Sequence, residues 1–199
     1  MPSVRVATNF FLVLTLVADA VVAVAVVIGA SALVSRRARA AAVGIIQFVG
    51  PQALLVAWIV AIVTTAGSLY YSLHAGYVPC ELCWYQRIAM YPLVAVLGVG
   101  WLRRDRFAWM TVLPFVAVGA PLSLYHWLVE RVPSFAEGSS CSVVAPCTAP
   151  YFEKLGFVTL AWMCLSGFLL IATLVATSVA VQRLPGAVVP DDAPGTVAR

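Results

Sequence analysis

The sequence predicts an all-α membrane protein: a four-helix transmembrane bundle with one extra N-terminal transmembrane helix. Hydrophobic residues make up 63% of the 199 residues and charged residues only 10%, and the mean hydropathy is +0.99. This composition is far from that of a soluble globular domain. A helix needs about 20 mostly apolar residues to cross a bilayer core of about 30 Å. Five stretches meet this requirement: residues 10–34, 43–71, 84–102, 107–129 and 155–181.

The basic residues at the helix ends predict how the chain is oriented. Seven arginines fall on one side of the predicted bundle, and they are Arg36, Arg37, Arg39, Arg103, Arg104, Arg106 and Arg183. A weaker basic set falls on the other side, and it comprises Arg5, Arg87, Arg131 and Lys154. The positive-inside rule then places the arginine-rich side in the cytoplasm. The N-terminus and segments 72–83 and 130–154 therefore face outward. The net charge of +4 reflects this orientation and does not indicate nucleic-acid binding.

The first predicted span allows two interpretations. Small residues such as Ala30 and Ala32 near its end resemble a signal-peptide cleavage site. The basic triplet that follows opposes translocation, and only Arg5 precedes the apolar run, so an uncleaved helix with its N-terminus outside fits better. Asp19 lies inside this span. An acid at membrane depth indicates a function or a specific partner, and a polar crevice between helices would satisfy it equally well.

The chain divides into three predicted parts. Residues 1–42 form the extra helix and a cytoplasmic basic link, residues 43–182 form the four-helix bundle, and residues 183–199 form a disordered cytoplasmic tail rich in Pro, Gly and Asp. The outward loop, residues 130–154, contains three prolines and several small residues, which predicts irregular structure apart from a short helix over 151–155. Loops of this kind often carry function.

Four of the five cysteines fall on the outward side, which permits disulfides. Cys80 and Cys83 form a Cys-x-x-Cys pair where the third span begins, and the unpaired N–H groups of a helix start stabilise a thiolate. A lowered thiol pKa speeds thiol–disulfide exchange. Arg87 lies one turn beyond Cys83 on the same helix face. The arginine either supplies a positive charge near that sulfur or extends to the lipid headgroups.

The second outward pair, Cys141 and Cys147, lies in the mobile loop. A disulfide there closes a short ring, which stabilises a protein little and suits exchange chemistry better, although a plain staple is the alternative. Zinc bound by all four outward cysteines is another alternative, but the five-residue spacing of the second pair is unusual for such sites. Cys164 lies within the fifth span and is expected to be a buried, inert thiol.

His126 lies about 19 residues beyond the cytoplasmic start of the fourth span, which places it about 28 Å across the membrane. This is the depth of Arg87. Two polar residues from different helices thus meet the same leaflet as Cys83, as a site for a polar ring with a lipid-soluble chain requires. An interfacial histidine satisfied by water is the alternative interpretation.

The segment that begins at Cys80 resembles a known family. Pro79-Cys80-Glu81-Leu82-Cys83-Trp84-Tyr85-Gln86-Arg87-Ile88-Ala89-Met90-Tyr91-Pro92 is similar to the DsbB disulfide-bond formation proteins, particularly their BdbC-like branch. The likeness continues through Leu124-Tyr125-His126-Trp127, the second cysteine pair and the segment over residues 151–157, and it covers about residues 43–181.

The resemblance implies a thiol:quinone oxidoreductase of the bacterial cytoplasmic membrane. Such a protein reoxidises a DsbA-like thioredoxin-fold partner and passes the electrons to ubiquinone or menaquinone. By position, Cys141 matches the cysteine that bonds the partner, and Cys147 matches its loop mate. Cys80 and Cys83 match the pair that reoxidises the loop, with Cys83 facing the quinone. Two further residues match quinone-binding positions, namely Arg87 and His126. Gln86 stands where some members carry an acid, and the first span lies outside the family pattern.

Two other functions are also compatible with these cysteines. Vitamin K epoxide reductase relatives also use two cysteine pairs, but their loop pair precedes the Cys-x-x-Cys, and the order here is reversed. A non-enzymatic membrane protein with stapled or zinc-bound cysteines is the competing class.

Overall fold

The computed structural model describes residues 2–136, 141 and 145–184, and over these residues it is helical with no strand. Five helices are long and apolar enough to cross a membrane, which confirms the predicted number of spans. The helices are α1 (Pro2–Val34), α2 (Arg36–Leu69), η1 (Tyr70–His74), α3 (Glu81–Leu102), α4 (Ala108–Val129), α5 (Pro133–Ala136) and α6 (Leu160–Gln182). Of the predicted tail, 183–199, all but the first two residues lie outside the described part.

The predicted helix ends need three corrections. The basic link is not a separate loop, because α2 begins at Arg36 directly after Ser35, whose side chain accepts a hydrogen bond from the N–H of Ala38. Charged residues end a membrane span without ending a helix. The last span begins at Leu160, where Thr159 is the N-cap. Residues 151–155 are not helical and lead into an isolated bridge between Lys154 and Val158, and the short helix of this loop is α5 instead.

Small residues let α2 lie at the centre of the bundle. Ala53, Ala57 and Ala61 follow one helix face at four-residue spacing and are fully buried. Close approach of backbones drives helix association in lipid, where hydrophobic burial between helices gains little. α2 packs on α1, α3 and α6, and α4 completes the bundle by packing on α3 and α6.

The contact of α4 with α6 depends on Gly119. A Cβ atom at this position would overlap the ring of Phe168, a fully buried residue of α6. The absence of a side chain at Gly119 therefore sets how closely the two helices approach.

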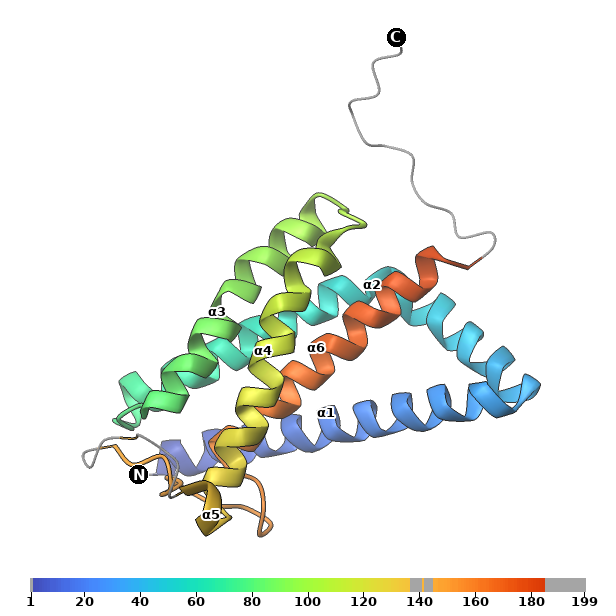
Figure 1. Cartoon of the computed structure of the whole chain (residues 1–199). Coiled ribbons are helices and arrows are strands. Elements are labelled where there is room, and N and C mark those ends of the chain that lie inside the picture. The colour runs from blue at the N-terminus through green and yellow to red at the C-terminus, as the bar shows by residue number, and fades with distance from the viewer. Residues whose placement is uncertain (1, 137–140, 142–144, 185–199) are drawn as a thin grey trace.

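All four predicted redox cysteines lie at one end of the bundle. The N-terminal end of α1, the start of α3 and the connection from α4 to α6 meet there, and the α3–α4 turn lies at the opposite end (Figure 1). Cys80 and Cys147 belong to one buried cluster with Leu82 and Val129 at this end. The bundle thus brings together two cysteine pairs that are far apart in the sequence.

Candidate redox site

Cys80 caps the start of α3. Its backbone is extended, and its Sγ accepts a hydrogen bond from the N–H of Cys83 at 3.2 Å. This contact satisfies one of the N–H groups that the first turn of a helix leaves unpaired. Pro79 lies directly before this cap residue, outside the helix, where its lack of an N–H group costs no helical hydrogen bond. The sequence therefore places a thiol sulfur at the positive end of α3.

His126 faces Cys80 from α4. Its Nε2 lies 3.6 Å from the Sγ of Cys80, and its Nδ1 lies 3.3 Å from the Oε1 of Gln86. An amide oxygen only accepts hydrogen bonds, so Nδ1 carries a hydrogen. Nε2 is then free to accept the thiol proton of Cys80, or to donate to its thiolate once the imidazole is protonated.

These contacts lower the pKa of Cys80 to about 5. The largest cause is the hydrogen bond from the side chain of Cys83, and the bonds from His126 and from the N–H of Cys83 act in the same direction. Burial of Cys80 opposes them. The Cys80 sulfur is therefore a thiolate at neutral pH when the pair is reduced, as rapid exchange requires.

Glu130 and Thr159 complete the surroundings of His126. The Oε1 of Glu130 lies 3.9 Å from Nε2 of His126, and the hydroxyl of Thr159 donates to Oε2 at 2.6 Å. The side chains of His126 and Glu130 are each only 4% exposed. Burial raises the pKa of Glu130, although the hydrogen bond from Thr159 and the nearby His126 oppose this. The carboxyl of Glu130 is therefore held beside the imidazole of His126, and burial makes its proton harder to lose.

Cys141 and Cys147 form a disulfide. Cys147 is buried and Cys141 is partly exposed, so the two sulfurs differ in access. The segment after the disulfide is held against the start of α3, because the hydroxyl of Tyr151 donates to the carbonyl of Val78 at 2.8 Å. The oxidised loop pair therefore lies beside the reduced Cys80 and Cys83 pair, both of whose thiols are free.

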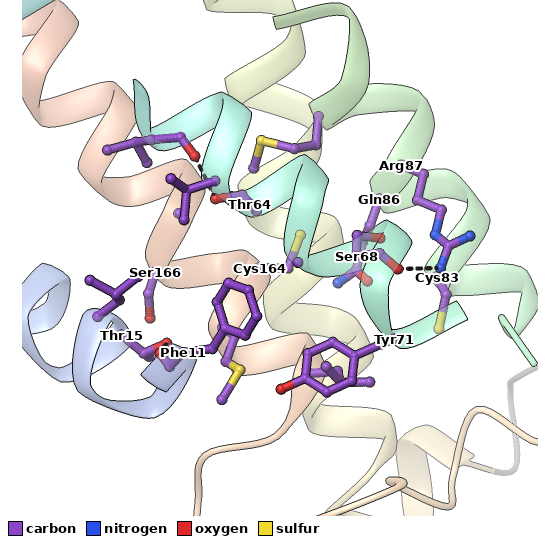
Figure 2. A pocket seen from close by; sticks show the side chains of 18 of the residues that line it. Phe11, Thr15, Thr64, Ser68, Tyr71, Cys83, Gln86, Arg87, Cys164 and Ser166 are labelled. Carbon is purple, nitrogen blue, oxygen red and sulfur yellow. Dashed lines mark hydrogen bonds between the residues drawn. The ribbon is translucent and has the colours of Figure 1, made fainter. Parts of the chain in front are cut away.

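A cavity of about 270 Å³ begins beside Cys83 and extends between α1, α2, α3 and α6. Figure 2 shows Cys83, Gln86 and Arg87 entering it from α3, with Phe11 and Thr15 of α1 on the opposite side. Most of the wall is apolar; the guanidinium of Arg87 and the thiol of Cys83 enter from α3, and hydroxyls such as those of Thr15, Thr64 and Ser166 lie elsewhere on the wall. Such a cavity suits an apolar molecule with one polar end.

Of the two residues predicted at quinone-binding positions on α3 and α4, only Arg87 lines the cavity, and His126 does not. Arg87 lines the cavity, donates to the carbonyl of Ser68 at 3.3 Å and lies over the ring of Trp84. His126 is 3% exposed and is not among the residues that line the cavity. Gln86 lies between the two, since it contacts His126 through Oε1 and also lines the cavity. Cys164, expected to be inert in a packed span, lines the cavity as well.

Gln86, Glu130 and Thr159 were not predicted as site residues. Glu130 follows His126 by four residues at a helix end, a spacing that puts both on one face and could have indicated a pair. Gln86 precedes Arg87 and lies one turn from Cys83, but the sequence does not say which side of α3 faces the cavity. Thr159 carries no local signal beyond being a helix cap.

The same groups could hold a metal ion. The ligand atoms of Cys80, Cys83 and His126 all lie within 4.8 Å of one another. The zinc site considered from the sequence used all four outward cysteines, and the disulfide between Cys141 and Cys147 removes two of these from ligation. A zinc alternative thus requires His126 as a ligand.

Residues 50–177 match the family model described as Disulfide bond formation protein DsbB. The chain belongs to the DsbB family. It is 42% identical to Disulfide bond formation protein C of Bacillus subtilis over 118 residues, which are 59% of this chain and 86% of the relative. It is 45% identical to Probable disulfide formation protein C of Bacillus cereus over 121 residues, which are 60% of this chain and 86% of the relative.

A third relative, Probable disulfide formation protein of Coxiella burnetii, is 40% identical over 111 residues, which are 55% of this chain and 76% of the relative. No solved structure matches the chain significantly. The predicted resemblance to the DsbB family is confirmed, and this DsbB-family member is a multi-pass membrane protein of disulfide bond formation. The family match begins inside α2, so α1 lies outside it.

Proposed function

We propose that this DsbB-family protein oxidises a thioredoxin-fold, DsbA-like partner through Cys141 and Cys147 and passes the electrons through Cys80 and Cys83 to a membrane quinone. The observation that carries the proposal is the position of Cys83. It neighbours Cys80 and the loop disulfide on one side and lines an apolar cavity on the other. Electrons that leave the loop pair can therefore reach a lipid-soluble acceptor.

The first exchange occurs at the loop. A thiolate of the reduced partner attacks the partly exposed sulfur of Cys141, and the buried Cys147 leaves as a thiolate. The second partner thiol then attacks the mixed disulfide. This releases the partner with a disulfide and leaves Cys141 and Cys147 reduced, so two electrons and two protons have moved to the loop.

The second exchange occurs at the start of α3. With the Cys80 and Cys83 pair oxidised, the Cys147 thiolate attacks the sulfur of Cys80, its neighbour in the buried cluster, and Cys83 leaves facing the cavity. Cys141 then resolves the bond and restores the loop disulfide, which leaves Cys80 and Cys83 reduced. Cys80 leaves as a thiolate, and the proton released by the attacking Cys141 thiol passes to His126, whose Nε2 faces the Cys80 sulfur and lies beside Glu130.

The residues of the cavity fit a quinone. Gln86 is buried, and its Nε2 has no hydrogen-bond partner among the described residues, although its Oε1 contacts His126. An unpaired buried donor is costly, and a ring carbonyl between Gln86 and Arg87 would satisfy it. A bound quinone would take up two electrons and two protons and leave as a quinol. Gln86 and Arg87 would orient its ring, and the apolar wall would hold its chain.

The sidedness of this reaction follows from the arginines. The cysteine end of the bundle lies opposite the α3–α4 turn that carries Arg103, Arg104 and Arg106 (Figure 1). The positive-inside rule puts that turn in the cytoplasm. We therefore place the protein in the bacterial cytoplasmic membrane with its redox cysteines outside, where secreted proteins acquire disulfides.

Quinone consumption tests the proposal directly. Purified protein supplied with quinone and a reduced thioredoxin-fold partner should reduce the quinone, and Cys83→Ser should stop turnover. Cys164→Ser is the matched control, because it removes a thiol that lines the same cavity without a neighbouring cysteine. Full turnover by Cys83→Ser would overturn the mechanism.

Trapping and metal analysis test the remaining steps. A Cys147→Ser variant should accumulate a partner adduct on Cys141, because the mixed disulfide then lacks its neighbouring thiol. Stoichiometric zinc in the purified protein, lost in His126→Ala, would instead support a metal site at Cys80, Cys83 and His126.

A further inference from the structure

Helix α1 supplies one wall of the cavity. Six of its residues line this space, and they are Phe11, Leu14, Thr15, Val17, Ala18 and Val21. The family match covers residues 50–177 and therefore excludes the whole helix. The aligned 118 residues are 86% of the Bacillus subtilis relative, which leaves about 19 residues outside the alignment, fewer than the 33 residues of α1. This wall is thus a feature of the present chain rather than of the family core.

The buried face of α1 is the face that meets the cavity and α2. Thr8, Thr15 and Ala18 are the buried residues of the helix among those described, and Phe11 falls on the same face at helical spacing. The ring of Phe11 lies against Gly67 of α2, where a Cβ atom would lie 2.9 Å from it. The rest of α1 is largely exposed, as expected for a helix that contacts lipid on its other faces.

Two side-chain hydrogen bonds fix this face in position. The indole N–H of Trp162 donates to Oδ2 of Asp19 at 2.9 Å, and the hydroxyl of Tyr71 donates to Oγ1 of Thr8 at 3.2 Å. These bonds lie about three helical turns apart and bracket Thr15 and Ala18. Polar bonds between helices are a principal means of association in lipid. Asp19 therefore serves to hold α1 against α6 beside the cavity.

The charged and thiol groups of the cavity lie at its α3 end, which favours one orientation of a ligand with a single polar end. The groups near α3 are Cys83, Gln86 and Arg87, whereas α1 contributes mainly apolar side chains. Leu14, Val17 and Val21 line the cavity and are also substantially exposed on the outer surface of α1. They therefore mark where the cavity meets the lipid.

We propose that α1 is the wall that receives the isoprenoid chain of the quinone, and that the small residues Thr15 and Ala18 determine which chains the cavity admits. The ring lies at Cys83, Gln86 and Arg87, and the chain passes Thr15 and Ala18 and leaves to the bilayer over the stripe of Leu14, Val17 and Val21. This inference rests on the proposed function, because it assumes that the ligand of the cavity is a quinone.

The test compares Ala18→Phe with Val13→Phe in the full chain. Ala18→Phe fills the cavity wall, whereas Val13 is 59% exposed and does not line the cavity. The dissociation constants of a short-chain and a decyl-chain ubiquinone are measured by quenching of tryptophan fluorescence. Ala18→Phe should weaken binding of the decyl quinone about tenfold, the factor that corresponds to about 1.4 kcal/mol, and should affect the short-chain quinone less. Val13→Phe should bind both like the wild type.

A second measurement needs no variant. A quinone with a photoreactive group on its chain should label the wild-type protein within residues 11–21, and labelling confined to α3 would overturn the proposal. Unchanged decyl-quinone binding by a folded Ala18→Phe would do the same; if that variant fails to fold, Thr15→Leu replaces it under the same criterion. Failure of the wild type to bind or reduce any quinone would instead overturn the proposed function.

Discussion

The Oε1 of Gln86 lies 3.3 Å from Nδ1 of His126, the Nε2 of the same amide has no hydrogen-bond partner among the described residues, and the side chain of Gln86 also lines the cavity. The amide thus separates the histidine from the cavity. On one side His126 serves the thiol of Cys80, and on the other side Gln86 presents a donor to whatever occupies the cavity. The thiol chemistry and the ligand contacts are assigned to different side chains.

Replacing Gln86 tests this division. Gln86→Met keeps the size of the side chain but removes the donor, so quinone binding should weaken about fivefold, which corresponds to about 1 kcal/mol for one lost hydrogen bond. The dissociation constant of a short-chain quinone measures the effect. Tyr85→Phe is the control, because it removes an exposed hydroxyl of the same helix that donates a hydrogen bond to Glu81. Unchanged binding by Gln86→Met would show that the amide does not contact the ligand.

The reactivity of Cys80 should depend on His126. A lowered pKa keeps the sulfur ionised until the pH falls through that value, so alkylation of reduced Cys80 should persist down to about pH 5. His126→Phe removes a donor to the thiolate, and the loss of reactivity should then occur at a higher pH. The rate of iodoacetamide labelling, read by peptide mass spectrometry, gives the profile.

His74→Phe is the matched control for this experiment, because His74 is the other histidine of the chain and is exposed. Its profile should equal that of the wild type. Coincident profiles for the two variants would show that His126 does not stabilise the thiolate.

The bond between Asp19 and Trp162 should contribute to stability. Asp19→Ala leaves the indole N–H without its partner, and we expect a loss of about 0.6 kcal/mol, the average measured for interhelical polar bonds in membrane proteins, with about 1.7 kcal/mol as the upper limit. Asp19→Asn retains an acceptor oxygen and should lose less. Thermal unfolding in detergent measures both variants, and equal stability of Asp19→Ala and the wild type would contradict the role of this bond.

The contact between α4 and α6 should be intolerant of a larger residue at Gly119. Gly119→Ala places a Cβ atom against the ring of Phe168, and overpacking of this kind costs about 1–3 kcal/mol. Gly44→Ala is the control, because nothing lies within 4 Å of a Cβ atom there. Phe168→Leu in the Gly119→Ala background should recover part of the loss, as expected for two residues in contact. Additive losses in the double variant would argue against the clash.

Much of the fold was predictable because a membrane-spanning helix can be identified from its own short stretch of sequence. A run of about 20 apolar residues crosses a bilayer wherever it occurs, so the five spans followed from composition. The helix ends were less predictable. The arginines after Ser35 suggested a link, but nothing there breaks a helix and α2 starts at once. Thr159 begins the last helix later than hydropathy indicated, because a cap depends on one side chain rather than on an average.

The family, the five spans and the four cysteines at one end of the bundle were all predictable from the sequence alone. Only the packed helices show that His126 faces Cys80, that Gln86 and Arg87 line the cavity, and that α1 forms one of its walls. The reason is physical: helices in lipid are apolar on most faces, so hydrophobic periodicity does not say which face meets a neighbour. The rotation of each helix about its own axis is set by close contacts such as those of Gly119 with Phe168 and of Gly67 with Phe11. These contacts exist only in the assembled bundle.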